Sequence, residues 1–289
     1  LVGSEMCIRD SSLPGKRRNT MKQTKYELNS ILEQSSPTII VGMHRSGTSL
    51  LSRMFTDMGI HMGVWLSRDA EAVFFQKINR QIYAKAKAHW AEPESILEAM
   101  NNPAFVNEMA EFAREKLTSG IRPAIQRFFG TNTWYRDIQS PDYFWGWKDP
   151  RTALVIPVWQ QVFPNAKWVH IIRNGIDVAI SLYERALRQK QKWLLKLYRF
   201  DYSDKTLNFS YCFNLWEVYL SSIQAGVKKI NSDDLIQLQY EDLLKTPASS
   251  LTQVLNFINY PIQSEKVREV TERVDQSRLD NTPALKKHR

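Results

Sequence analysis

Residues 37–59, PTIIVGMHRSGTSLLSRMFTDMG, carry the strongest structural signal in this chain. The first part, residues 37–42, is a short apolar run that ends in glycine, which is typical of a buried strand. From Leu50 onward, apolar side chains recur at the spacing of an amphipathic helix, and Gly59 is a typical residue to end one. These residues therefore predict a strand, a loop and a helix in succession.

Strand and helix patterns alternate along the rest of the chain. Further strands are expected at 143–148, 167–172 and 235–240, and helices at 71–90, 151–162, 175–190 and 205–229. Prolines punctuate the residues between about 94 and 130, which show no strand pattern and predict a run of short helices, a helical insertion. Strands separated by helices predict an α/β fold with a P-loop-like parallel sheet, flanked by helices on both faces.

The composition is that of a globular protein. The chain has 289 residues, of which 43% are hydrophobic and 24% are charged, and this excludes a disordered chain. Residues 1–20 show no hydrophobic period, so we expect a non-native or disordered leader there and a single domain over 21–289. Cys7 and Cys212 are too few for a disulfide scaffold and indicate a reducing, cytoplasmic compartment. No apolar run approaches the roughly 18 residues that a membrane span needs.

The charge balance points to an anionic partner. The 39 Lys and Arg exceed the 30 Asp and Glu, which gives a net charge of +9. Such a surplus favours nucleic acid, an acidic membrane surface, or a small molecule that bears phosphate or sulfate. No recognised nucleic-acid-binding motif accompanies the charge, so nucleic acid is not the expected partner. Residues 185–199 hold six cations and no acid, and are either a solvated helix face, the path of an anionic acceptor, or a contact with a membrane surface.

The loop after the first strand, residues 42–49, has the chemistry of a phosphate site. Backbone N–H groups in such a loop point at an anion, and the N-terminus of the following helix adds partial positive charge. The glycine spacing matches the loop of nucleotide triphosphatases, but Thr48 stands where their lysine must be. Arg45, inside the loop, is the available cation. With no clear magnesium-binding Asp either, the loop predicts phosphate binding without the lysine and metal of phosphoryl transfer.

A second anion site is expected after the strand at 167–172. Arg173 follows the carboxyl end of this strand, where open α/β sheets bind ligands, and Asn174 is a plausible N-cap of the next helix. Ser181 and Arg185 lie four residues apart on one face of that helix and can join Arg173 at one phosphate. Another stripe of the same helix is expected to pack on the sheet: Ile176, Ile180, Tyr183 and Leu187.

Two phosphate sites without metal apparatus suit a bisphosphorylated nucleotide. Residues 44–50 resemble the 5′-phosphosulfate loop of PAPS-dependent sulfotransferases, in the Arg-Ser-Gly-Thr form of bacterial and Golgi members, and 173–181 resemble their 3′-phosphate motif. Residues 147–151 are similar to the Lys-Asp-Pro segment of the protein-tyrosine sulfotransferase branch, and 240–243 to a late Tyr-Glu-Asp segment. The resemblance covers roughly 37–260. It implies PAPS (3′-phosphoadenosine 5′-phosphosulfate) as co-substrate, PAP as product, and no metal.

The resemblance also implies roles for single residues. Arg45 would be the cation at the leaving group, the backbone N–H groups of Ser46, Gly47, Thr48 and Ser49 would hold the 5′-phosphate, and Arg173, Ser181 and Arg185 would hold the 3′-phosphate. Lys148 would contact the bridging or transferred sulfuryl oxygens, because sulfuryl transfer, like phosphoryl transfer, needs fixed cations.

The general base is less well indicated. Cytosolic small-molecule sulfotransferases use the His of a Lys-Thr-His segment, and this chain has Lys148-Asp149-Pro150 there. Other branches use a glutamate after the first helix, and Glu71 occupies that place, with Asp69 and His61 as alternatives.

The predicted function is sulfuryl transfer from PAPS to a hydroxyl or amine acceptor, which could be a small molecule, a glycan, a lipid or a peptide. A P-loop nucleotide kinase or NTPase is the enzyme alternative, disfavoured by Thr48. A basic nucleic-acid-binding domain is the non-enzyme alternative. Acceptor contacts are expected in the insertion and in residues 191–211.

Overall fold

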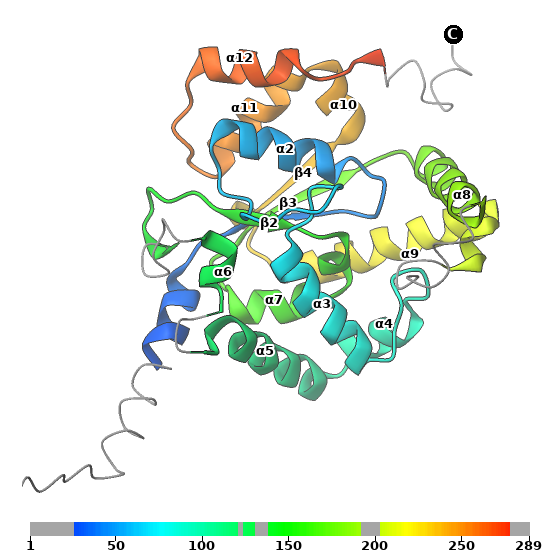
Figure 1. Cartoon of the computed structure of the whole chain (residues 1–289), viewed down its shortest axis with the longest axis horizontal. Coiled ribbons are helices and arrows are strands. Elements are labelled where there is room, and N and C mark those ends of the chain that lie inside the picture. Colours follow the sequence, from blue (N-terminus) through cyan, green and yellow to red (C-terminus); the bar gives the residue numbers. More distant parts are fainter. Residues whose placement is uncertain (1–25, 121–123, 131–137, 192–202, 278–289) are drawn as a thin grey trace, which may run out of the picture.

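The computed structural model describes residues 26–120, 124–130, 138–191 and 203–277, so the expected leader at 1–20 lies outside the described residues. Within these residues one parallel sheet has the strand order β2-β1-β3-β4 (Figure 1). The strands are β1 (Thr38–Val41), β2 (Gly146–Lys148), β3 (Lys167–Ile172) and β4 (Leu235–Gln239). The predicted α/β fold with a P-loop-like parallel sheet is confirmed.

The register of the sheet brings three predicted site segments to one edge. Ile40 of β1 is paired with Lys148 of β2, and Val41 of β1 is paired with His170 of β3. Because the strands are parallel, their carboxyl ends meet at the same edge. The loop after β1, the end of β2 and the residues after β3 therefore lie together.

Helices cover both faces of the sheet, as predicted (Figure 1). One face carries α2 (Thr48–Met58), α10 (Tyr240–Lys245), α11 (Pro247–Phe257) and α12 (Ser264–Glu272). The other carries α3 (Val73–Lys85), α5 (Pro103–Thr118), α7 (Ile156–Val162) and α9 (Phe209–Val227). Side chains alternate along a strand, so Ile39 and Val41 join the core of the second face while Ile40 joins that of the first.

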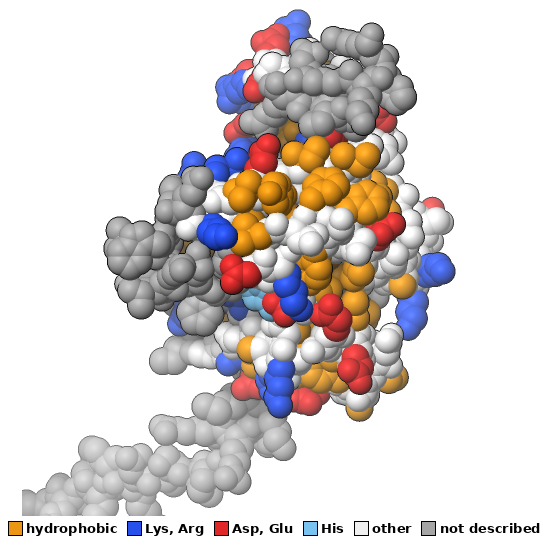
Figure 2. Space-filling view, turned by 90° about the vertical axis from the view of Figure 1, so that its right-hand side faces the viewer, with side chains coloured by type: hydrophobic (Ala, Val, Ile, Leu, Met, Phe, Trp, Pro, Cys, Tyr) orange, Lys and Arg blue, Asp and Glu red, His pale blue; other side chains and the backbone are white. Residues whose placement is uncertain are grey.

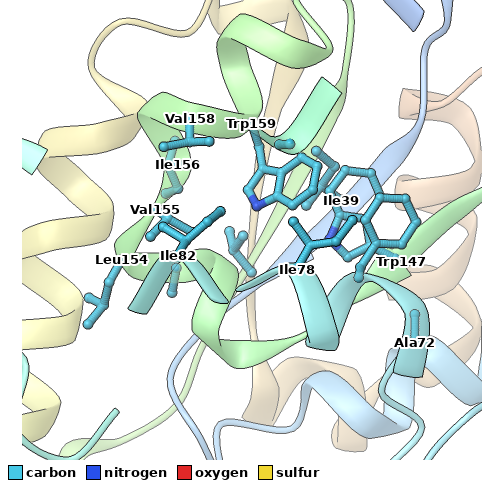
Figure 3. Packing of buried hydrophobic residues seen from close by; sticks show 14 of the residues in the cluster. Ile39, Ala72, Ile78, Ile82, Trp147, Leu154, Val155, Ile156, Val158 and Trp159 are labelled. Atoms are coloured by element: carbon cyan, nitrogen blue, oxygen red, sulfur yellow. The ribbon is translucent and has the colours of Figure 1, made fainter. Parts of the chain in front are cut away.

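Aromatic rings fill the core beside β2. The Trp147 ring stacks on Phe75 of α3 with ring centroids 4.0 Å apart, and Trp159 of α7 meets Trp147 edge-on at 5.1 Å. Figure 3 shows both tryptophans with Ile39 and Ile78 in the same cluster. The indole N–H of Trp159 donates to Asn79 Oδ1 at 2.8 Å, so its polar atom is satisfied inside the core.

The residues between α3 and β2 form α4 (Glu94–Met100), α5 and α6 (Gln126–Phe129), and no strand occurs among those that the structure describes. α5 is longer than the short helices that the prolines predict. Its proline, Pro103, is in the first turn, and the Asn102 side chain caps the helix by accepting from Ala104 N. Proline is well tolerated in a first turn because its missing N–H has no helical partner there.

Two predicted helices are each divided in two. Residues 151–162 form the 3₁₀ helix η2 (Pro150–Leu154) and then α7, which has Pro157 in its first turn. Residues 205–229 form η4 (Asp204–Leu207) and α9, and Asn208 between them caps α9 by accepting from Tyr211 N. A proline or a capping Asn begins a new helix where the apolar period alone predicts continuation. A third short 3₁₀ helix, η5 (Ser232–Asp234), precedes β4.

The predicted orientation of the helix after β3 is correct for Tyr183, which packs against the core that contains Ile39 and Val41, and wrong for Ile176 and Leu187. In α8 (Gly175–Gln191), Ile176 and Leu187 are 46% and 38% exposed instead of packing on the sheet. The buried side of α8 packs mainly against α9 and η4, and consists of Val178, Ala179, Leu182 and Ala186. These mostly small side chains let the two helices approach closely, which the apolar period does not reveal. Figure 2 looks onto the side of the molecule on which α8 lies in Figure 1, and it shows hydrophobic side chains gathered there.

No helix among the described residues is both long and apolar enough to span a bilayer.

Candidate functional site

The loop between β1 and α2 is folded as a cradle. The Ser46 N–H and hydroxyl both donate to Met43 O, at 3.1 and 2.6 Å, and tighten the turn. Gly47 precedes α2 with φ +96°, and a Cβ on it would lie 2.1 Å from the Tyr240 ring. None of the described side chains caps α2. Leu50 N donates to Gly47 O at 2.9 Å, and the N–H groups of Thr48 and Ser49 before it are left for an anion.

Arg45 joins the loop to the second predicted anion site. Its Nε donates to Ser181 Oγ of α8 at 2.9 Å, and Arg173 Nη1 donates to the Arg45 carbonyl at 3.1 Å. Arg45 also has φ +72°, a conformation that non-glycine residues seldom adopt. The structure thus brings Arg45 to Arg173 and Ser181, which lie 128 and 136 positions further along the sequence.

Aromatic rings support the two other arginines. The Arg173 guanidinium lies over the Tyr240 ring, 4.8 Å from its centroid, and Arg185 lies 5.9 Å from the Trp90 ring centroid. Asn174 acts as predicted, since its Oδ1 accepts from Ile176 N at 2.9 Å in the first turn of α8. Such contacts restrict where each guanidinium can point.

At the loop between β1 and α2, the positive charges exceed the negative charges nearby. Desolvation and then the charge of Arg185 lower the pKa of the Arg45 guanidinium. Burial, followed by the charges of Arg151 and Arg185, holds the pKa of His44 well below 6.5, so its imidazole is neutral at pH 7. An anion placed here would gain from all of these cations.

Lys148, at the end of β2, reaches into the same loop. Its Nζ donates to the Asp69 carbonyl at 2.8 Å, to Ser49 Oγ at 3.1 Å and to Glu71 Oε1 at 3.5 Å. The side chain is only 2% exposed, and burial lowers the pKa of the ammonium while Glu71 opposes that effect. The lysine therefore connects the first helix turn to the residues before α3.

Glu71 lies in a buried network of charged groups. It is 8% exposed, pairs with Lys148, accepts from Gln76 Nε2, and lies 3.9 Å from Arg151 Nη1. Burial and then the nearby carboxylate of Asp149 raise the pKa of Glu71, against the opposing effect of the two cations. A buried carboxylate with a raised pKa is a typical proton acceptor.

The two alternative bases are placed differently. Asp69 contributes its backbone carbonyl to Ser49 and Lys148, while its side chain is exposed. His61 lies at the opposite edge of the sheet, because α2 carries the chain back to the amino end of β2, where the His61 carbonyl accepts from Gly146 N at 2.9 Å. The structure brings Glu71 to Lys148 and does not bring His61 there.

No role was predicted from the sequence for three residues of this region, which are His44, Trp90 and Arg151. His44 is buried with its ring 4.4 Å from that of Trp90, and Nε2 has no hydrogen-bond partner among the described residues. Arg151 pairs with Asp149 at 3.1 Å and faces Glu71. The position of Arg151 within 147–151 was a usable signal, whereas Trp90 has no local motif.

No cluster of three or more His, Cys, Asp or Glu that could hold a metal ion occurs in the described part of the chain.

Comparison with known proteins finds a matching family profile, two relatives and several solved structures. The profile of the sulfotransferase family matches residues 37–264. A putative protein-tyrosine sulfotransferase of Caenorhabditis elegans is 26% identical over 121 residues, which are 42% of each chain. An uncharacterized protein of Aquifex aeolicus is 24% identical over 228 residues, 78% of this chain and 26% of the relative. The chain thus matches less than half the length of either relative.

Solved structures with a similar course of the chain are also sulfotransferases. The sulfotransferase domain from the curacin biosynthetic pathway has 16% identity and a TM-score of 0.49, with 84% of this chain and 79% of that one covered. The sulfotransferase domain of the Synechococcus PCC 7002 olefin synthase has 17% identity and a TM-score of 0.48, with 85% and 84% covered.

Proposed function

The chain belongs to the sulfotransferase family, and on this premise we propose that it transfers a sulfuryl group from PAPS to a hydroxyl or amine acceptor by in-line displacement. The observation that carries the proposal is the contact between its two anion motifs. Arg45 Nε bonds Ser181 Oγ, and Arg173 bonds the Arg45 carbonyl. A donor with phosphates at both ends of one nucleoside needs two such sites side by side.

The residues present fit this donor. The uncapped N-terminus of α2 and the N–H groups of Gly47, Thr48 and Ser49 suit the 5′-phosphate, since they offer donors at a helix start, whereas the Ser46 N–H is already bonded to Met43 O. Arg173, Ser181 and Arg185 suit the 3′-phosphate, because two guanidinium groups and a hydroxyl can surround its oxygens. PAPS, when bound, supplies the activated sulfuryl group.

Arg45 and Lys148 neutralise charge in this scheme. Negative charge grows on the leaving phosphate and the sulfuryl oxygens as the bond breaks, and fixed cations lower that barrier. Arg45 leaves Ser181 for the leaving group, and Lys148, already 3.1 Å from Ser49 Oγ, approaches the transferred oxygens. Both cations already lie at the loop before reaction, so the main rearrangement is the opening of the Arg45–Ser181 hydrogen bond.

Glu71 takes the proton of the acceptor. Its raised pKa makes the carboxylate a stronger base than an exposed glutamate. The acceptor oxygen or nitrogen forms the new bond to sulfur, and its proton passes to a Glu71 oxygen. Gln76 and Arg151 orient the carboxylate from the side of the core.

Thermal unfolding with and without PAP tests the donor site. PAP at about 100 times its Kd should stabilise the protein by about 2.7 kcal/mol, without metal and in the presence of EDTA. Arg173→Ala should abolish most of this shift. Arg268→Ala, an exposed arginine of α12, is the matched control and should leave the shift unchanged.

The same unfolding measurement with ADP or Mg·ATP tests the alternative function, a P-loop nucleotide kinase or NTPase. Stabilisation by Mg·ATP and none by PAP would contradict the proposal and favour a phosphoryl-transfer enzyme. An equal PAP shift in Arg173→Ala would show that the nucleotide binds elsewhere.

A further inference from the structure

A groove separate from the proposed donor site lies at the base of the hairpin that carries Glu71. In this hairpin Leu66 bridges to Ala72, and the Trp65 carbonyl accepts from Val73 N at 3.1 Å. The groove encloses about 700 Å³. It is lined by residues before α3, on α3, at the end of α5 and around α6, among them Val64, Trp65, Phe74, Lys77, Lys116 and Arg127. None of the donor-site residues lines it.

Trp65 gives the groove an exposed aromatic wall. The side chain is 75% exposed, although the backbone on both sides of it is held: Val64 N donates to Phe128 O at 3.1 Å, and Trp65 O accepts from Val73 N. Gly63 allows this close approach, because a Cβ there would lie 2.6 Å from the Phe128 ring. The held backbone places Trp65 next to Val64, which is 48% exposed, and the two side chains form an exposed apolar patch at the groove.

Three cations line the groove beside this apolar wall. They are Lys77, Lys116 and Arg127, and none of the described residues that line the groove is Asp or Glu. None of the three belongs to an ion pair formed within the described ranges. Lys116 lies 5.2 Å from the Phe112 ring centroid. The groove thus combines an aromatic wall with uncompensated positive charge.

Another cavity of the molecule provides a comparison. It encloses about 580 Å³ near the start of β3, and its lining is part apolar and part polar, with Trp168 in its wall. Among the described residues it has one cation, Lys229, and one acid, Asp234, and that acid pairs with Lys167 at 2.7 Å. Two cavities of similar size therefore differ in charge, because three cations line the groove beside Trp65 and one lines this cavity.

We propose that the groove formed by Trp65, Phe74, Lys77, Lys116 and Arg127 is a binding site for an organic anion with an aromatic or aliphatic body. The body of the ligand packs on the two rings, and its acidic group lies among the three cations. The site is separate from the proposed donor site. Because it lies against the hairpin of Asp69 and Glu71, its ligand is held next to the segment that forms the proposed catalytic centre.

Two fluorescent probes test this site. One is 8-anilinonaphthalene-1-sulfonate, an aromatic anion, and the other is N-phenyl-1-naphthylamine, which has the same rings without the sulfonate. Titrations are made with saturating PAP, so that the donor site is not available to the sulfonate. The wild type should bind the anionic probe more tightly than the neutral one.

The variants separate charge from apolar contact. Lys77→Gln/Arg127→Gln should weaken the anionic probe about fivefold and leave the neutral probe unchanged, as expected for two exposed charge contacts. Trp65→Ala should weaken both probes. Lys229→Gln, in the second cavity, is the matched control and should change neither.

Equal affinities for the two probes in the wild type, or equal losses in Lys77→Gln/Arg127→Gln and Lys229→Gln, would overturn the proposal. Each substituted side chain, Lys229 included, is exposed, and unfolding curves verify that each variant is folded. A protein that fails to bind PAP but passes these titrations would refute the donor site and leave this inference standing.

Discussion

Glu71 is the residue on which the proposed chemistry depends most. The alternative role for this buried carboxylate is purely structural, as the ion-pair partner of Lys148 and Arg151. Its pKa is nevertheless raised, because burial and Asp149 outweigh the two cations. A structural ion pair would hold the pKa down, so this balance favours a group that exchanges a proton.

Replacing Glu71 by Gln tests that role. We expect kcat to fall by about 10²- to 10⁴-fold, as for loss of a general base, with the PAP-induced stabilisation unchanged. The measurement is sulfuryl transfer to whichever phenol, alcohol or amine probe the wild type accepts. Glu98→Gln, on the exposed side of α4, is the control and should retain full activity.

The pH dependence of the same reaction gives an independent test of Glu71 as the general base. The base must be ionised, so wild-type kcat should decline as pH falls through the raised pKa of Glu71. In Glu71→Gln this acidic limb should disappear from the residual activity. A limb of unchanged position in the variant would assign the proton transfer to another group.

At the scale of elements, the contact between Gly47 and Tyr240 of α10 fixes the shape of the loop between β1 and α2. Tyr240 begins α10, lies against Gly47 and carries the Arg173 guanidinium on its ring. One aromatic side chain thus links the start of α2 to the residue after β3. Any side chain at position 47 must displace it.

Gly47→Ala should therefore cost more than backbone strain alone. Gly59 provides the matched control, since it has a similar φ of +99° but open space, with Tyr260 Oη 3.6 Å from an added Cβ. Gly59→Ala should lower the free energy of unfolding by about 1–2 kcal/mol. Gly47→Ala should lower it by about 1–3 kcal/mol more, from overpacking, and should lose the PAP response.

Chemical denaturation of the two variants measures this difference. Equal losses of stability, with PAP binding kept in Gly47→Ala, would mean that Tyr240 moves aside freely and that the cradle is not rigid.

For the whole molecule, a buried histidine in the central sheet predicts sensitivity to acid. His170 of β3 is buried, its Nδ1 has no partner among the described residues, and desolvation lowers its pKa to about 4. The unfolded chain binds a proton near the ordinary value of 6.5, before the folded protein does. Stability should thus fall as pH falls from about 6.5 to about 4.

His170→Gln should remove this part of the acid dependence. At about 1.4 kcal/mol for each pH unit, His170 accounts for a loss of about 3 kcal/mol between neutrality and pH 4. Urea unfolding at several pH values measures it. Parallel stability curves for wild type and variant would show that His170 is protonated in the folded state or has no such role.

Much of the architecture could be predicted because its signals are local. The strand at Thr38–Val41, the glycine-bounded loop and the helix after it follow from residues that are neighbours in the chain. The Asn174 cap depends on one side chain and an N–H two residues later. The stripe of α8 was assigned wrongly because an apolar period does not say which partner helix will cover which side.

The sequence by itself determined the α/β alternation, the parallel sheet, and the chemical character of the two anion motifs. Only the tertiary structure decided that Arg45 meets Ser181, that Lys148 meets Glu71, and that Trp65 stands in solvent beside three cations. The physical reason is range. Backbone preferences and phosphate-loop chemistry act over a few residues, whereas these meetings depend on strand register and helix packing between segments far apart in the chain.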